Sequence, residues 1–230
     1  MPEIVENRET LKWPLEKKVE LSLQVIEEAY RRFQRVGVCW SGGKDSTALI
    51  HLFKRFGKPF KVIIVDTTVL FPETYEFFDR VTKEWELDVY RALPDVPWES
   101  VFFQGREVCC QKLKTEPLFK AIRELQLDAL AVGVRWTECE ARADEKYFKQ
   151  VNLYNTPHWR VHPLLHWTLD DVWTYTKQNN IPYNPLYDRG YKSIGCRTCT
   201  VPVPPEAPER AGRAQDKETI MRKLRQLGYF

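Results

Sequence analysis

The apolar and polar positions of the chain alternate between helical spacing and short strand-like runs. Apolar residues that recur every three or four positions predict helices, and short apolar runs that end in polar residues or glycine predict buried strands. Helices are predicted over 17–33, 45–56, 73–85, 114–125 and 216–227, and strands over 36–40, 61–65, 88–92, 129–134 and 159–164. Thr168 and Asp171 have the spacing of a capping box, which opens a further helix to about residue 178.

Short apolar strands that alternate with helices predict an α/β fold, with a parallel, five-stranded, Rossmann-like sheet and helices on both faces. Ligands of such sheets bind beyond the carboxyl ends of the strands. The proline-rich stretch 200–208 suits neither a helix nor a central strand. We therefore divide the chain into a nucleotide-binding domain, 1–200, and a Pro-rich arm with a C-terminal helix, 201–230.

Composition fits a globular protein of the cytoplasm. The chain has 230 residues, of which 43% are hydrophobic and 29% are charged. No apolar run approaches the roughly 20 residues of a membrane span, and the acidic start does not resemble a signal peptide. The net charge of +3 is too small to argue by itself for a nucleic-acid or membrane partner.

The segment after the first predicted strand has the composition of an anion cradle. Two glycines let the backbone approach a ligand closely, and the start of a helix presents N–H groups to it. Hydroxyl groups and a lysine add further donors, and the spacing is not that of a Walker A loop. An ordinary Gly-Gly turn is the alternative. The predicted nucleotide-binding residues of this loop are Ser41, Gly42, Gly43, Lys44, Asp45, Ser46 and Thr47.

The string SGGKDS resembles the pyrophosphate (PP) loop of the adenine-nucleotide α-hydrolase superfamily, which implies a HUP-type fold and cleavage of ATP between its α and β phosphates. The segment 66–75 resembles the "DT…FPETY" of sulfonucleotide reductases. The resemblance implies that Asp66 holds a ribose hydroxyl or a metal; a helix cap is the alternative. Gly133, Arg135 and Arg142 match "GxR…E…R", a strip that faces phosphates or sulfate in the family; surface solvation is the alternative for the arginines.

Six cysteines without an export signal indicate thiols, metal ligands or catalysis instead of structural disulfides. Cys109 and Cys110 are adjacent, and Cys196 and Cys199 form a C-x-x-C pair. Two such pairs suit a four-thiolate site for zinc or an iron–sulfur cluster, and reduced structural thiols are the other reading. The surrounding residues resemble "CC..RK..PL" and "SIGC..CT" of cluster-bearing adenylylsulfate reductases, which implies a 4Fe-4S cluster on these four cysteines.

The other two cysteines are assigned differently. Cys39 lies inside the first predicted strand, where a buried thiol behaves as a small apolar group. Cys139 stands between two glutamates, which should keep its thiol protonated. A catalytic or sulfur-carrying role for Cys139 stays open.

Two features depart from the sulfonucleotide reductases. Those enzymes attack sulfur with a cysteine of a C-terminal "ECG.H" motif, and no cysteine follows Cys199 here. Bacterial reductases also usually carry a degenerate phosphate loop, whereas this one is intact. The segments 209–213 and 228–230 are instead similar to the end of the small catalytic subunit of bacterial ATP sulfurylase.

The leading hypothesis is therefore an iron–sulfur PP-loop enzyme of sulfur metabolism that transfers an adenylyl group from ATP, bound with Mg2+, to an acceptor such as sulfate and releases pyrophosphate. Lys44, Arg135 and Arg142 are its predicted catalytic residues, because they would stabilise charge on the phosphates.

Three alternatives remain. The first is reduction of adenylylsulfate (APS) or its 3′-phosphorylated form (PAPS) with release of sulfite, for which Cys139 or a partner's cysteine would attack. The second is ATP-dependent sulfur insertion into tRNA or DNA, and the third is a non-enzymatic iron–sulfur nucleotide sensor. Besides the nucleotide, these hypotheses imply a redox or sulfur-donor protein and a second copy or a partner subunit, and no membrane.

Overall fold

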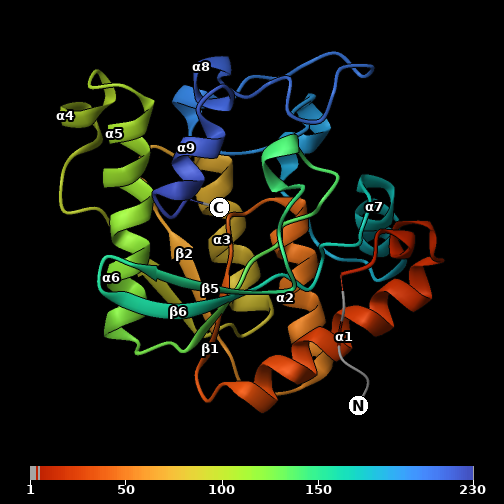
Figure 1. Cartoon of the computed structure of the whole chain (residues 1–230). Helices are drawn as coiled ribbons and strands as arrows, with labels where there is room; N and C mark the ends of the chain where they lie inside the picture. Colours follow the sequence, from red (N-terminus) through yellow and green to blue (C-terminus); the bar gives the residue numbers. More distant parts are fainter. Residues whose placement is uncertain (1–3, 5, 230) are drawn as a thin grey trace.

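A six-stranded sheet with helices on both faces forms the computed structural model, which describes residue 4 and residues 6–229. The strand order is β3-β2-β1-β4-β6-β5. All neighbouring strands pair in parallel except β5, which is antiparallel to β6. The strands are β1 (Val36–Cys39), β2 (Lys61–Val65), β3 (Val89–Ala92), β4 (Ala129–Ala131), β5 (Phe148–Leu153) and β6 (Thr156–Val161). The predicted α/β fold is confirmed (Figure 1).

The predicted count of five strands, all parallel, is wrong because β5 was missed. This edge strand carries polar residues at three of its six positions and buries only Val151 completely, so it lacks the apolar run that marked the others. Its turn to β6 uses Tyr154 and Asn155, both with positive φ, in place of the usual Asn-Gly. β4 and β6 each end three residues before the predicted position.

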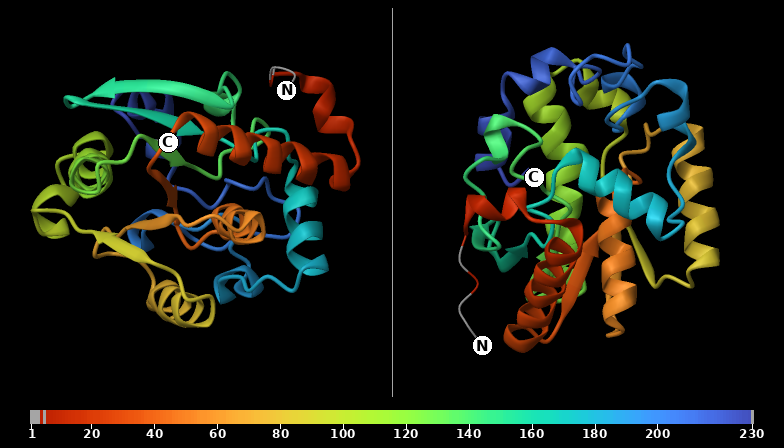
Figure 2. Two further views of the ribbon diagram at one scale, coloured as in Figure 1. Left: turned by 90° about the horizontal axis from the view of Figure 1, so that it is seen from below. Right: turned by 90° about the vertical axis from the view of Figure 1, so that its right-hand side faces the viewer.

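Helices cover both faces of the sheet. α6 packs against β2, β3 and β6, whereas α1 and α2 pack against each other, and α2 also contacts α7. The views in Figure 2 place α6 and α2 on opposite faces. The longer helices are α1 (Leu15–Arg32), α2 (Lys44–Phe56), α3 (Pro72–Glu84), α6 (Glu116–Glu124) and α7 (Leu169–Gln178). The capping box is present: Thr168 Oγ1 accepts from the Asp171 N–H, and Asp171 accepts from the Thr168 N–H.

Two predicted helices differ from those observed. The helix predicted over 114–125 continues a segment that begins earlier, because α5 (Arg106–Cys110) runs through a π-helical turn, Gln111–Thr115, into α6. The helix predicted over 216–227 is broken into α8 (Gln215–Glu218) and α9 (Met221–Gln226). The short helix α4 (Trp98–Phe102) was not predicted, and 3-10 turns occupy Arg8–Lys12, Glu140–Arg142, Pro185–Arg189 and Arg197–Cys199.

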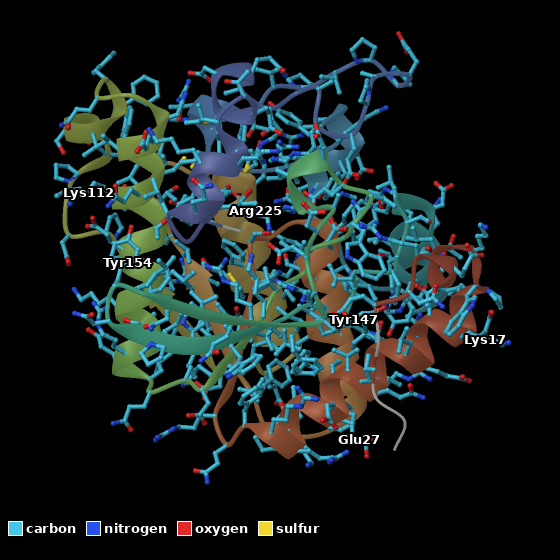
Figure 3. All side chains as sticks on the ribbon, in the orientation of Figure 1. Lys17, Glu27, Lys112, Tyr147, Tyr154 and Arg225 are labelled. Carbon is cyan, nitrogen blue, oxygen red and sulfur yellow. The ribbon has the colours of Figure 1, made fainter. Side chains whose placement is uncertain are left out.

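The C-terminal arm crosses the carboxyl end of the sheet, at the top of Figure 1. Thr200 and Arg213 form an isolated bridge that closes the arm on itself. The segment that follows is tied to the β5–β6 region, where the Tyr154 hydroxyl donates to the Leu227 carbonyl at 3.2 Å and Arg225 pairs with Glu145 (Figure 3). The division at residue 200 stays a prediction, but the arm and the sheet form one packed structure.

Among the described residues, no helix combines the length and the apolar character that crossing a membrane requires.

Candidate functional site

A cavity lies at the carboxyl ends of β1 and β4, where the fold class places ligands. It is lined by the loop after β1, the loop after β4, Tyr187 and the C-terminal arm. Of the residues predicted from the sequence, it brings together Ser41, Gly43, Lys44, Asp45, Ser46, Gly133 and Arg142. Four other predicted residues, Gly42, Thr47, Asp66 and Arg135, do not line it.

The PP loop is held by bonds within itself. Gly42 has a φ of 74°, which a side chain would strain, and Gly43 caps α2. The Ser46 hydroxyl donates to the Gly43 carbonyl at 3.0 Å and accepts from the Ser41 N–H at 3.2 Å. Thr47 donates to the same Gly43 carbonyl and is buried. Thr47 therefore stabilises the conformation of the loop and does not line the cavity.

Gly133 sets the distance between the two loops. A Cβ atom there would lie 3.0 Å from the Ser46 nitrogen and 3.1 Å from the Asp45 carbonyl carbon. Both are backbone atoms at the start of α2, so neither can turn away as a side chain would. The predicted involvement of Gly133 in the site thus has a physical basis in close backbone approach.

Four charged side chains form a cluster at the PP loop, which we call the PP-loop ion cluster: the buried Lys44 and Arg135 and the partly buried Asp45 and Glu209. Lys44 Nζ lies 3.0 Å from an Asp45 oxygen and 2.5 Å from Glu209 Oε1. Arg135 contacts the other Asp45 oxygen at 2.5 Å and both Glu209 oxygens at 2.6 and 2.7 Å. Arg135 is fully buried, so the predicted alternative of a solvated surface arginine is wrong for it.

The cluster keeps its members charged. Burial alone lowers the pKa of Lys44, but Asp45, Tyr187 and Glu209 outweigh it and raise that pKa above its ordinary value. Burial raises the pKa of Asp45, and Lys44 and Arg135 lower it further than burial raises it. Sequence reasoning missed the role of Glu209, because nothing in the spacing along an irregular arm shows which side chain faces the loop.

Cations outside this cluster also line the cavity. We call three of them, Lys114, Arg142 and Arg213, the cationic end. Arg142 pairs with Glu138 and is buried, so it too is not a solvated surface residue. The Nε atoms of Arg142 and Arg213 are buried and have no hydrogen-bond partner among the described residues. Because Lys114, Arg142 and Arg213 all line the cavity, their positive charge favours an anionic ligand there.

Tyr229 adjoins the cationic end. Its hydroxyl accepts from Lys217 Nζ at 2.8 Å, and Lys114 lies 5.6 Å from the centre of its ring. Burial raises the pKa of Tyr229, but Lys114 and Lys217 lower it further, to about 7. Arg142 was predicted from the sequence, but Lys114, Arg213 and Lys217 were not, since they come from the turn between α5 and α6, the arm and α8.

Asp66 lies at the end of β2, outside the cavity lining. It accepts hydrogen bonds from the Tyr75 hydroxyl at 2.8 Å and the Thr68 N–H at 2.9 Å. It does not cap α3, whose first residue follows Phe71. The predicted contact of Asp66 with a ribose or a metal stays a prediction.

The four cysteines predicted as cluster ligands are all buried. Cys109 and Cys110 lie at the end of α5, and Cys196 and Cys199 lie at the 3-10 turn before the arm. Burial raises the pKa of Cys109 to about 11, and the other three thiols, Cys110, Cys196 and Cys199, add to this by repulsion. Cys109 therefore lies within electrostatic range of the other three thiols.

No three His, Cys, Asp or Glu side chains in the described part of the chain are arranged to hold a single metal ion. A four-iron cluster separates its cysteine ligands more widely than one ion does, so four buried thiols around a common region remain compatible with it. Arg106 approaches Cys199 Sγ at 3.2 Å and Thr67 approaches Cys196 Sγ at 3.3 Å, which are the hydrogen bonds that thiolate ligands accept.

The two remaining cysteines differ in their surroundings. Cys39 lies at the floor of the cavity in the core, and burial raises its pKa to about 12, which agrees with the predicted packing role. Cys139 is partly exposed and caps the turn Glu140–Arg142 without lining the cavity.

A mostly parallel sheet with a glycine-rich loop between β1 and α2, and a cation-lined cavity above it, defines a nucleotide-binding α/β protein of the PP-loop class. Residues 35–202 match the family model described as "Phosphoadenosine phosphosulfate reductase domain". The chain belongs to this family, and the predicted resemblance is confirmed.

Individual relatives carry names of the same class of enzyme as the family model. The chain is 34% identical over 209 residues to adenosine 5′-phosphosulfate reductase 2 of Bacillus subtilis, which covers 85% of this chain and 86% of the relative. It is 32% identical over 202 residues to adenosine 5′-phosphosulfate reductase of Bacillus cereus (strain B4264), covering 84% and 85% of the two chains. These names favour the reductase alternative over our leading hypothesis of adenylyl transfer.

Solved structures support the fold. The phosphoadenylyl-sulfate reductase of Candida auris, crystallised with phosphate, superimposes with a TM-score of 0.67 at 25% identity and covers 86% of this chain and 99% of that one. FMN adenylyltransferase of Candida glabrata, bound to FMN and an ATP analogue, reaches a TM-score of 0.70 at 17% identity, covering 94% and 77%. At that identity the second similarity concerns the fold alone.

Proposed function

We propose that the protein binds a sulfonucleotide, APS or PAPS, and releases sulfite from it by transferring the sulfo group to a thiol. The observation that carries this proposal is the cationic end of the cavity. There, Lys114, Arg142 and Arg213 all line the cavity, and Lys114 lies within electrostatic range of Arg213. The phosphosulfate group is an anion that these donors can satisfy, and the names of the relatives point to the same substrate class.

The reaction requires two thiols. A thiolate attacks the sulfur atom, the bond from sulfur to the bridging oxygen breaks, and the nucleoside monophosphate (AMP from APS) leaves. A second thiol then attacks the sulfur of the first, which releases sulfite and leaves a disulfide. Lys114, Arg142 and Arg213 would stabilise the negative charge that grows on the departing phosphate.

The attacking thiol would come from outside the cavity. Cys39 is the one cysteine among the described residues that line it, and burial raises its pKa to about 12, so its thiolate is scarce at neutral pH. A dithiol protein that donates both thiols meets the requirement, in agreement with the predicted redox partner. Cys139, which is partly exposed and does not line the cavity, is the alternative nucleophile.

Cys109, Cys110, Cys196 and Cys199 are the residues that would hold a 4Fe-4S cluster. When bound, the cluster would cross-link α5 to the 196–199 turn and add its charge to the field around Lys114. Anaerobically purified protein is expected to be brown and to lose its colour in Cys196→Ala. Colourless wild-type protein carrying stoichiometric zinc would refute the cluster.

Adenylyl transfer is a second candidate because the PP loop is intact, although Lys44 and Arg135 already pair with Glu209, which the phosphates of ATP would have to displace. Mg2+ belongs to this candidate, as the ion that would accompany ATP. Sulfur insertion into tRNA or DNA stays an untested prediction.

One anaerobic assay separates the candidates. The protein is incubated with APS, with PAPS, or with ATP and sulfate, each with a reduced thioredoxin-type dithiol protein, while sulfite and pyrophosphate are followed together. We expect sulfite and the nucleoside phosphate in equal amounts from APS or PAPS. Sulfate-dependent pyrophosphate release from ATP without any sulfite from APS would instead establish the adenylyltransferase. In the same assay, Cys139→Ser is expected to keep its activity; loss would identify Cys139 as the nucleophile.

A further inference from the structure

Glu209 places a negative charge beside the PP loop. It belongs to the C-terminal arm and pairs with Lys44 and Arg135. Its carboxylate accepts from Lys44 at 2.5 Å and from Arg135 at 2.6 and 2.7 Å, and 12% of its side chain is exposed. Both cations of the PP-loop ion cluster, Lys44 and Arg135, are therefore already paired with a carboxylate of the protein.

The arm holds Glu209 firmly in this place. The next residue, Arg210, donates to Glu138 at 2.7 Å and to both Glu218 oxygens at 2.8 Å, so it is anchored to the loop after β4 and to α8. Burial lowers the pKa of Arg210, but Glu218 and Glu138 raise it further, and the side chain stays charged. Glu209 is therefore a fixed carboxylate and not a mobile surface group.

The charge balance of the PP-loop ion cluster differs from that of the cationic end. In the PP-loop ion cluster, two carboxylates balance one lysine and one arginine. At the cationic end, the cavity-lining cations Lys114, Arg142 and Arg213 are accompanied by one lining carboxylate, Glu138, which pairs with Arg142. An incoming anion is favoured at the cationic end, whereas at the PP loop it must displace Glu209 or be repelled by it.

We propose that Glu209 is a specificity-determining residue: its carboxylate occupies the pyrophosphate position of the PP loop, so that the site accepts a sulfonucleotide and discriminates against ATP. The identity of the accepted nucleotide rests on the function proposed above. The rejection of pyrophosphate groups rests on the ion cluster alone.

The test compares Glu209→Gln with Glu206→Gln. The first variant removes the negative charge and keeps the shape of the side chain. The second removes the same charge from an exposed glutamate of the same arm. Binding of inorganic pyrophosphate, of a non-hydrolysable ATP analogue and of AMP is measured by calorimetry.

We expect Glu209→Gln to bind pyrophosphate and the ATP analogue at least about tenfold more tightly than the wild type and Glu206→Gln do. AMP should bind all three proteins alike. Equal or weaker pyrophosphate binding by Glu209→Gln would overturn the inference.

Stability gives a second readout. Glu209→Gln leaves Lys44 and Arg135 with less compensating charge, so its melting temperature should fall, and added pyrophosphate should restore it by replacing the carboxylate. A variant that unfolds and is not rescued by pyrophosphate would also contradict the inference. None of these measurements uses sulfite release, so failure of the proposed reaction and failure of this inference are distinguishable.

Discussion

Individual residues determine how closely the two loops of the site approach. Gly133 lies in van der Waals contact with the backbone at the start of α2, and Gly42 adopts a left-handed conformation beside Thr74 and Phe78. Neither position has room for a Cβ without moving its neighbours. The PP loop is thus supported by backbone packing from two sides, in addition to its own hydrogen bonds.

Gly133→Ala is expected to weaken nucleotide binding by about tenfold or more while the protein still folds. The added Cβ would push on the Ser46 nitrogen and the Asp45 carbonyl and so move the N–H groups at the start of α2. Calorimetric titration with AMP, together with a thermal melt, measures both quantities. A variant with wild-type affinity would show that the loop tolerates the shift.

The loop residues could be predicted from the sequence, because glycines, hydroxyl groups and a lysine between a strand and a helix indicate an anion-binding loop by themselves. The sequence could not identify Glu209 as a partner of Lys44 or Lys114 as a residue that lines the cavity. Those contacts join segments far apart in the chain, Lys44 to Glu209 for example, and depend on how an irregular arm folds back. Periodicity carries no information about that.

At the scale of elements, α7 illustrates a helix whose start is determined locally. The Thr168–Asp171 capping box satisfies the first N–H groups, and the same Asp171 carboxylate accepts from buried Lys18 at 2.5 Å. Such a helix is predictable from four residues. β5 is not, because a half-exposed edge strand pairs with β6 through its backbone and needs no apolar pattern. The π-helical turn between α5 and α6 also has no local signal.

Thr168→Ala should lower the free energy of unfolding by about 1 kcal/mol, because it leaves the Asp171 N–H without its cap. Thr174→Ala, an exposed change within the same helix, is the control and should have no effect or stabilise slightly. Urea denaturation of both variants measures the difference. Equal stabilities would mean that packing alone holds the start of α7.

At the scale of the whole molecule, buried histidines couple folding to pH. Burial lowers the pKa of His158, His162 and His166 to about 4. In the unfolded chain each takes up a proton near its ordinary pKa of about 6.5. The unfolded state therefore binds more protons between about pH 6.5 and pH 4, and stability falls as the pH falls through that window.

Lowering the pH from about 7 to about 5 should cost up to about 2 kcal/mol of unfolding free energy per buried histidine. His158→Gln, which removes one titrating group, should reduce this pH dependence by about one third of the histidine contribution. Urea denaturation at the two pH values measures it. A variant with the full wild-type pH dependence would exclude His158 as a contributor.

The central claim is that the cationic end holds the sulfo-bearing end of a sulfonucleotide, and the affinity of APS relative to AMP tests it most directly. The matched variants are Arg213→Gln and Arg222→Gln, the second an exposed arginine of α9 that pairs with Glu140. We expect wild-type protein and Arg222→Gln to bind APS at least about tenfold more tightly than AMP, and Arg213→Gln to lose that preference. Equal affinity of the wild type for APS and AMP would contradict the account.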